Sequence, residues 1–303
     1  MSVLASTLTY LQAVVIGLLQ GITELFPISS LGHSVLVPEL LGWDKLVTGQ
    51  SADESFYLAF LVGLHVATAI ALLIFFRKDW ARVVAGFFSS IRKRRIETAA
   101  ERLAWLLVLG TIPVGVVGLV FEHKLRTVFA KPTAAAVFLM INGVILLLGE
   151  RLRRRSEVRA LVETHAHHTD EAHEVTRNLD SLELREGFLV GASQILALFA
   201  GISRSGVAMV GGLLRGLDHE DAARFSFMLA TPIIFAAGLY KIPDLLGSNG
   251  EGIRGQVVVG SIASGLAAYV SVRFLTRYFE TRTLTPFAIY SLAFGAAMLL
   301  YIR

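Results

Sequence analysis

Residues 56–76 read FYLAFLVGLHVATAIALLIFF, and this stretch holds one ionisable side chain, His65. A helical run of about 20 apolar residues matches the hydrocarbon thickness of a bilayer. Residues 103–121, LAWLLVLGTIPVGVVGLVF, form a second run with no ionisable group. We therefore predict an all-α polytopic membrane protein of about six spans. The four other predicted spans are 133–149, 222–242, 256–275 and 285–302.

The composition of the whole chain agrees with this class. Of 303 residues, 54% are hydrophobic and 17% are charged, whereas soluble domains carry about 25% charged residues. The net charge is +4, but Lys and Arg flank the apolar runs. We therefore interpret the basic balance as cytoplasmic loops that follow the positive-inside rule, and not as nucleic-acid binding. The absence of cysteine excludes disulfides, thiolate chemistry and Cys-based metal sites.

The distribution of basic residues predicts the orientation. Eight Lys and Arg side chains lie in loop 77–102, and four Arg side chains lie between Arg151 and Arg155. Both regions should be cytoplasmic. Loop 243–255 has one basic residue and should face outside, although loop 122–132, with three, fits this scheme less well.

Two further apolar regions, 10–43 and 187–217, are interrupted by Pro, Gly, Ser and charged residues. Neither half of either region is long enough to cross a bilayer alone. Broken backbone at membrane depth is tolerated where it is buried in protein or lines a cavity. We therefore predict two re-entrant helix pairs.

These two regions look like copies of each other. Residues 17–44 align without gaps with residues 191–218, and eight positions are identical, among them Ser29 with Ser203 and Gly32 with Gly206. One broken segment and three spans per half imply two inverted-topology repeats, 1–149 and 187–303, because three is odd. Paired interrupted segments point to a functional site near the membrane midplane.

The predicted linker, 150–186, contains His165, His167, His168 and His173 among acidic residues. Such a run is compatible with a metal site. A disordered cytoplasmic linker between the two halves is the simpler interpretation.

The first broken region carries QGITELFPISSLGH from Gln20 to His33. A helix places Gln20 and Glu24 on one face, and Pro27 ends or bends that helix. The polar residues that follow at the break are Ser29, Ser30 and His33. Ionisable residues inside a membrane are functional candidates, although a polar cluster that only ties helices together is the alternative.

The second broken region carries GISRSG from Gly201 to Gly206. A guanidinium in an apolar stretch needs an anion, and Arg is the side chain best matched to phosphate. Hydroxyls and backbone N–H groups at the start of the next helix complete an anion-binding site. The predicted phosphate ligands are Ser29, Ser203, Arg204, Ser205 and Gly206. The alternative is a structural ion pair between Arg204 and Glu24 with no ligand.

If the two breaks meet, their combined side chains suit phosphoryl transfer, with an anion clamp, a nucleophile and an acid/base group. Gln20 and Glu24 are also candidate ligands of a divalent cation, Mg²⁺ or Ca²⁺, because such ions prefer oxygen. A different class of function, a lipid transporter or flippase, also uses inverted repeats with broken helices.

The two motifs, QGITExxPISSxGH and GISRSG, resemble the signatures of the bacterial undecaprenyl-diphosphate phosphatase (bacitracin-resistance) family. The resemblance covers most of the chain, including FSFMLATP at 225–232. It implies a multi-pass protein of the bacterial plasma membrane that removes the terminal phosphate of undecaprenyl diphosphate. That reaction recycles the lipid carrier of peptidoglycan synthesis and confers bacitracin resistance.

The resemblance also implies the catalytic residues Glu24, Ser30, His33 and Arg204. Ser30 is then the nucleophile or a phosphate ligand and His33 the acid/base group, with a phosphohistidine at His33 as the reverse assignment. The implied partners are a polyprenyl diphosphate and membrane lipid, with no nucleic acid. A second copy of the chain is a candidate partner.

Overall fold

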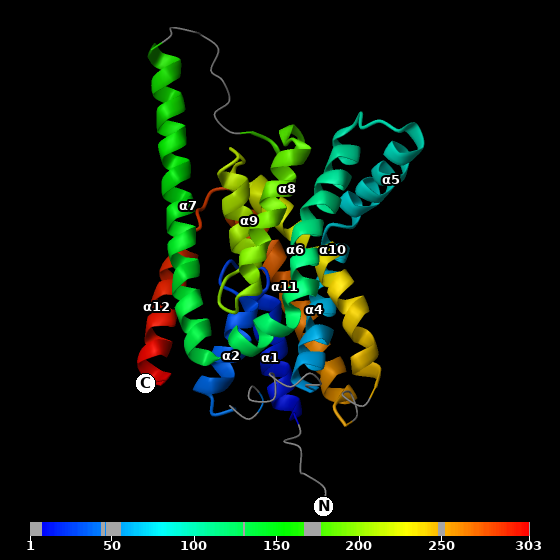
Figure 1. The fold of residues 1–303 in the computed structure, drawn as a ribbon, viewed down its shortest axis with the longest axis vertical. Helices are drawn as coiled ribbons and strands as arrows, with labels where there is room; N and C mark the ends of the chain where they lie inside the picture. The colour runs from blue at the N-terminus through cyan, green and yellow to red at the C-terminus, as the bar shows by residue number, and fades with distance from the viewer. Residues whose placement is uncertain are drawn as a thin grey trace, which may run out of the picture.

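The computed structural model describes residues 8–43, 46, 56–129, 131–166, 177–247 and 252–302. The regular elements within these ranges are helices, apart from one isolated bridge between Arg177 and Leu217. The described part is therefore all-α, as predicted (Figure 1). In chain order the helices are α1 (Tyr10–Thr23), α2 (Ser30–Leu40), α4 (Phe56–Phe75), α5 (Arg77–Lys93), α6 (Ala99–Phe129), α7 (Pro132–Ala166), η2 (Leu179–Ser181), α8 (Leu184–Ser193), η3 (Gln194–Leu198), α9 (Arg204–Leu213), α10 (His219–Leu246), α11 (Arg254–Tyr278) and α12 (Thr285–Ile302).

Four of the described helices contain a stretch that is long and apolar enough to cross a bilayer by itself. These stretches are Ala99–Phe121, Pro132–Ser156, Arg254–Tyr278 and Thr285–Ile302. A fifth is reached if α4 is counted together with α5, which is bent away from it by 88°. The remaining predicted span, 222–242, lies inside α10, a 28-residue helix that contains Pro232 and Pro243. By length and composition, the described chain therefore has four or five candidate spans.

The linker differs from the prediction at its start. Helix α7 continues through Ala166, so residues 150–166 are helical and not an extended connection. The sequence there is rich in Glu, Arg, Leu and Ala, which are strong helix formers. The histidines at 167, 168 and 173 lie outside the described residues, as does the side chain of His165.

The first broken segment is α1 followed by α2. These helices are 14 and 11 residues long, too short for a hydrocarbon layer of about 30 Å at about 1.5 Å per residue. The chain turns between them because Ser29 adopts a left-handed φ of 69° and caps α2, accepting a hydrogen bond from Gly32 N at 3.2 Å. Pro27 lies within the turn.

The second broken segment is α8, η3 and α9. Here the turn falls at Gly201, whose φ of 112° is in the left-handed region that glycine tolerates best. Ser203 then caps α9, because its Oγ accepts a hydrogen bond from Gly206 N at 3.1 Å. Both segments thus share a Ser–x–x–Gly cap, although the capping serine has a left-handed φ of 69° in the first and an extended φ of −84° in the second.

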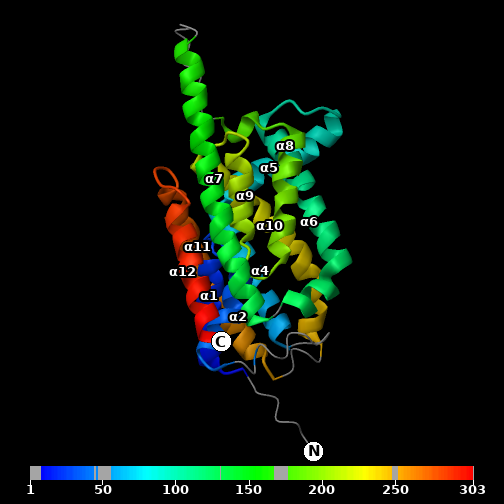
Figure 2. The same cartoon turned by 60° about the vertical axis from the view of Figure 1, so that its left-hand side comes forward.

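Glycine contacts bring each broken segment against a long helix. A Cβ at Gly17 would lie 2.4 Å from the carbonyl oxygen of Gly260, so α1 touches the backbone of α11. A Cβ at Gly191 would lie 2.2 Å from the carbonyl oxygen of Gly110, so α8 touches the backbone of α6. Helices α7 and α12 also pack side by side, as both views show (Figures 1 and 2).

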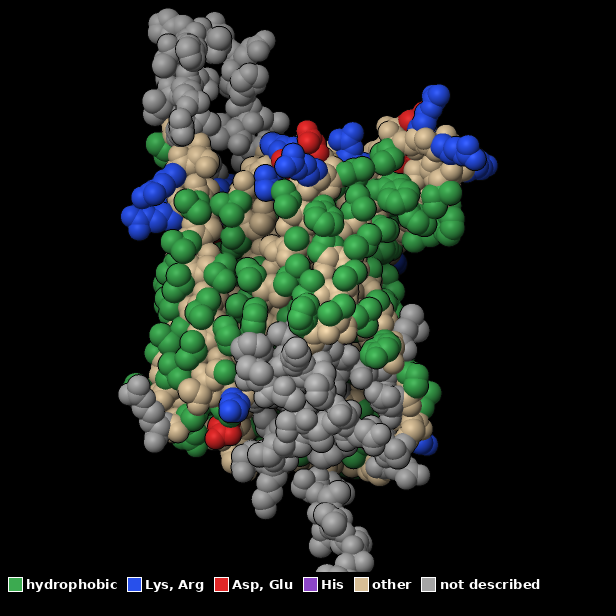
Figure 3. Space-filling view, in the orientation of Figure 1, with side chains coloured by type: hydrophobic (Ala, Val, Ile, Leu, Met, Phe, Trp, Pro, Cys, Tyr) green, Lys and Arg blue, Asp and Glu red, His purple; other side chains and the backbone are tan. Residues whose placement is uncertain are grey.

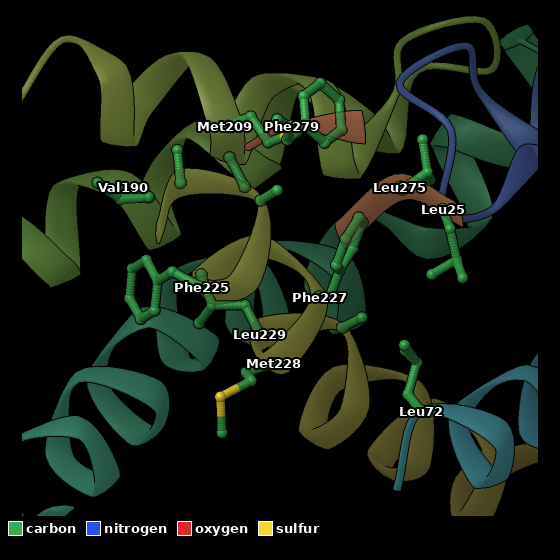
Figure 4. Packing of buried hydrophobic residues seen from close by; sticks show 14 of the residues in the cluster. Leu25, Leu72, Val190, Met209, Phe225, Phe227, Met228, Leu229, Leu275 and Phe279 are labelled. Atoms are coloured by element: carbon green, nitrogen blue, oxygen red, sulfur yellow. The ribbon is translucent and has the colours of Figure 1, made fainter. Parts of the chain in front are cut away.

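The apolar core gathers around α10. Phe225, Phe227 and Leu229 are fully buried or nearly so, and they project from α10 toward a cluster that includes Val190 of α8 and Leu72 of α4 (Figure 4). On the face shown in Figure 3, apolar side chains are spread over the middle of the described part, while Lys and Arg gather at the end formed by α5, α7 and α8. An apolar belt with one basic end is the pattern expected of a membrane protein with a cytoplasmic face.

Candidate active site

Glu24 lies at the C-terminal end of α1, one residue beyond its last helical turn. One of its oxygens, Oε2, accepts a hydrogen bond from Gln20 Nε2 at 3.1 Å, as the predicted spacing of four residues requires. The same oxygen accepts a short hydrogen bond of 2.5 Å from Ser30 Oγ, at the start of α2. The break therefore folds a serine hydroxyl back onto the carboxylate.

Arg204 comes from the other broken segment, as the first residue of α9. Its Nη2 donates to Glu24 Oε1 at 2.9 Å, and its Nη1 lies 3.4 Å from the carbonyl oxygen of Ser226. The two breaks meet, as predicted, and each carboxylate oxygen of Glu24 is bound from a different segment.

The Glu24–Arg204 pair is buried, with 6% and 14% of the two side chains exposed. Burying two charges costs several kcal/mol per ion, so such a pair is weak evidence for a purely stabilising role. This contact is the one that the alternative interpretation, a structural ion pair without a ligand, requires, and it does not by itself separate that interpretation from a phosphate site. It also holds a guanidinium beside a serine hydroxyl, where a phosphoryl group would need it.

His33 does not take part in this cluster. Its Nδ1 contacts Ser29 O at 2.7 Å and its Nε2 contacts the Tyr290 hydroxyl at 2.8 Å. The ring is 1% exposed and stacks on Tyr290 and Phe294 of α12. Both ring nitrogens are therefore engaged away from Ser30, and contact with a substrate would require the ring to turn.

The predicted phosphate ligands around the breaks are largely engaged with each other. Ser29 Oγ accepts from Gly32 N and from Gly201 N, both at 3.2 Å. Ser205 Oγ lies 3.0 Å from Ser203 Oγ and 3.3 Å from Phe26 O. These hydroxyls tie one broken segment to the other, and Gly206 N is used by the cap of α9.

Two residues at the site were missed by sequence reasoning. His65 of α4 places Nε2 at 3.4 Å from Glu24 Oε2, with Nδ1 on Leu61 O at 2.8 Å. Asn142 of α7 contacts both breaks, at Pro27 O and Ser203 N. A signal was present, because each is an isolated polar side chain in an otherwise apolar predicted span.

Gln20 and Glu24 are the predicted ligands of a divalent cation, and most of their oxygen atoms are already hydrogen-bonded. Both oxygens of Glu24 already have partners, one of them a guanidinium, and the described residues contain no group of three His, Cys, Asp or Glu side chains placed to hold a metal. The buried Gln20 Oε1 has no hydrogen-bond partner. These two residues therefore offer one free oxygen and do not form a cation site by themselves.

Candidate spans and a Ser–Glu–Arg cluster where two breaks meet define a multi-pass helical membrane protein with a polar, charged cluster in its interior. The model of one family, described as "Bacitracin resistance protein BacA", matches residues 13–297. The chain belongs to this family.

Curated relatives agree over nearly the whole length. The chain is 60% identical to the undecaprenyl-diphosphatase of Mycolicibacterium paratuberculosis, covering 97% of this chain and 98% of the relative. It is 58% identical to undecaprenyl-diphosphatase 2 of Frankia alni, covering 95% and 96%. At greater distance it is 42% identical to undecaprenyl-diphosphatase 2 of Chromobacterium violaceum, covering 96% and 98%.

Proposed function

We propose that this chain hydrolyses undecaprenyl diphosphate to undecaprenyl phosphate and inorganic phosphate in the bacterial plasma membrane. The reaction recycles the lipid carrier of peptidoglycan synthesis and confers bacitracin resistance. The observation that carries the proposal is that the Glu24 carboxylate accepts hydrogen bonds from both Ser30 Oγ, at 2.5 Å, and Arg204 Nη2, at 2.9 Å. Relatives named for this activity at up to 60% identity support it.

Ser30 is the proposed nucleophile. Its hydroxyl already donates to Glu24, which takes the proton as Oγ attacks the terminal phosphorus. Arg204 binds the phosphoryl oxygens, and undecaprenyl phosphate leaves in line. Water then hydrolyses the phosphoserine and Oγ recovers a proton. Charge neutralisation by a positioned guanidinium is a large term in phosphoryl transfer.

A phosphohistidine at His33 is the other assignment. It requires the imidazole to leave Ser29 O and the Tyr290 hydroxyl. The geometry favours Ser30, because its hydroxyl is already bonded to a carboxylate base.

The topology proposed for the chain has six spans and two re-entrant pairs. They form two inverted repeats, 1–149 and 187–303, which are joined by the cytoplasmic linker 150–186. The reciprocal contacts of Gly17 with Gly260 and of Gly191 with Gly110 support it. Further support comes from Figure 1, where the first broken segment lies toward the end opposite the basic one and the second toward the basic end. The first break then opens outward, and the lipid enters laterally from the bilayer.

Mg²⁺ or Ca²⁺ remains a proposal. Such an ion would be held mainly by the diphosphate, with Gln20 Oε1 as the oxygen that the protein offers. A homodimer is likewise a proposal, and sedimentation of the detergent-solubilised protein tests it.

A lipid flippase is the second candidate, because reciprocal repeats around a central charged site are typical of transporters. Phosphate release by purified protein in detergent, where no gradient exists, separates the two functions. A flippase without hydrolase activity releases no phosphate under these conditions.

The direct test is phosphate release from undecaprenyl diphosphate, with and without chelator, for wild type, Arg204→Ala and Ser30→Ala. We expect turnover by the wild type and a loss of about 10³-fold in Arg204→Ala. Near-normal turnover in Arg204→Ala would overturn the site. Normal turnover in Ser30→Ala would move the nucleophile to His33.

A further inference from the structure

Asn142 lies in the N-terminal third of α7 and its side chain is completely buried. Its Oδ1 accepts a hydrogen bond from the backbone N–H of Ser203 at 3.0 Å. Its Nδ2 donates to the carbonyl oxygen of Pro27 at 2.9 Å and to Ser291 Oγ at 3.2 Å. One amide from a long helix therefore bonds both broken segments.

The partners fix the orientation of this amide. Ser203 N–H can only donate and Pro27 C=O can only accept. If Oδ1 and Nδ2 were exchanged, the amide nitrogen would face the Ser203 N–H, donor against donor, and the amide oxygen would face the Pro27 carbonyl, acceptor against acceptor. The contact therefore requires a side chain that has an acceptor and a donor about one amide width apart, and among short side chains only Asn supplies both.

The backbone groups that Asn142 holds are adjacent to the reacting side chains. Ser203 immediately precedes Arg204, and Pro27 lies three residues before Ser30. Fixing these two groups sets the separation between the hydroxyl and the guanidinium, which meet on Glu24. Reacting groups must be held to well within 1 Å, because a misplacement of that size costs about 10²-fold in rate.

We propose that Asn142 is a positioning residue that holds the two breaks in the register needed for phosphoryl transfer. The inference rests on the proposed phosphatase function and extends it to a residue on neither motif. Asn142 acts through Ser30 and Arg204 and does not itself touch the phosphate. Its loss therefore lowers kcat, whereas binding of the prenyl chain, and with it much of KM, is retained.

Two matched controls separate positioning from general packing. Ser291→Ala removes the third partner of the same amide and leaves both break contacts in place. Thr68→Val removes a buried interhelical contact of 3.1 Å between α4 and α11, a polar tie of similar depth that bonds neither break.

The experiment measures kcat and KM for phosphate release from undecaprenyl diphosphate by full-length protein in detergent, with melting temperature and elution volume recorded for each variant. The test variant is Asn142→Leu. Asn142→Asp is the second test variant, because it keeps the size and one acceptor if Leu prevents folding. We expect kcat to fall about 10²-fold in Asn142→Leu, with KM changing much less and both controls near wild type.

Three outcomes overturn the inference while leaving the phosphatase function standing. These are a normal kcat in both Asn142 variants, an equal fall in Ser291→Ala or Thr68→Val, or a fall that only matches the lost fraction of folded protein. Absence of phosphate release by the wild type would instead remove the proposed function on which the inference rests.

Discussion

The first and second broken segments begin alike. Each opens with a capping box, which pairs Thr9 with Gln12 in the first segment and Glu183 with Glu186 in the second. Each then touches the backbone of a long helix through a glycine, and in each a Ser cap bonded by a glycine N–H begins the helix after the break. The two segments therefore share the features that start the first helix, pack it against a long helix and start the helix after the break.

The segments differ where the chemistry is proposed. Ser30 in the first aligns with Arg204 in the second, and Glu24 aligns with Leu198. The breaks therefore supply complementary halves of one site, a carboxylate with a hydroxyl from one side and a guanidinium from the other. The features common to both segments build the scaffold, and the proposed chemistry depends on the few positions at which the segments differ.

Changing Glu24 to the residue of the other copy gives the largest expected effect. Glu24→Leu makes the first segment resemble the second and removes the acceptor of Ser30 and Arg204. We expect phosphate release to fall by about 10²–10⁴-fold, the range of a general base.

Glu24→Gln is the matched control for shape, because it keeps the volume and removes the charge. It should be nearly as inactive as Glu24→Leu in the same assay. Activity within tenfold of wild type in Glu24→Gln would mean that the carboxylate is not the base.

The reciprocal glycine contacts give the next largest effect. Gly17→Ala and Gly191→Ala each drive a Cβ into a backbone carbonyl, at 2.4 and 2.2 Å, and backbone cannot move aside as a side chain can. We expect each to lose about 1–3 kcal/mol of stability, measured as a lower melting temperature in detergent.

Gly118→Ala is the control, because the nearest atom to its Cβ is 3.7 Å away on the Leu198 side chain. It should melt like wild type or slightly higher. If only one of Gly17→Ala and Gly191→Ala destabilises the protein, the two halves do not pack equivalently.

Much of this arrangement could be predicted from the sequence. The apolar runs predicted α4, α10, α11 and α12 to within four residues at each end, because these features depend on local sequence, whereas α6 and α7 continue past the predicted spans to Phe129 and Ala166. The proximity of Glu24, Ser30 and Arg204 followed from the duplication. The position of His33, away from this cluster, could not be predicted, because its partner Tyr290 comes from α12 and no local pattern links the two residues.

His65 and Asn142 were missed for the same physical reason. Each was visible as a polar residue in an apolar span, but the face that a buried helix turns to a site depends on tertiary packing. The helical start of the linker was missed because its charges suggested disorder, although Glu and Arg also favour helix.

His65→Ala tests the member of the cluster that neither broken segment supplies. It removes one partner of Glu24 Oε2, at 3.4 Å, while Ser30, Gln20 and Arg204 remain bonded to the carboxylate. A long charge-assisted contact is worth roughly 1.5 kcal/mol, so we expect kcat/KM to fall about tenfold. A loss as large as that of Glu24→Leu would show that His65 takes a direct part in the reaction.

The smallest effect is expected where the two capping boxes differ. Glu186 also forms a bidentate ion pair with Arg177, at 2.8 and 2.9 Å, while Gln12 occupies the equivalent place in the first segment. Glu186→Gln therefore gives the second capping box the same third helical residue as the first, while Glu183 and Thr9 still differ. With 37% of Arg177 exposed, the lost ion pair should cost less than about 1 kcal/mol.

The pH dependence identifies the cause of that loss. The hydrogen-bonded Arg177 guanidinium holds the pKa of Glu186 below its ordinary value, so the pair stabilises the folded state above the ordinary Glu pKa of about 4.3. This stability is lost as pH falls through the lowered folded pKa. The melting temperatures of wild type and Glu186→Gln should differ at neutral pH and converge in acid. A difference that stays constant with pH would instead place the effect in the geometry of the cap.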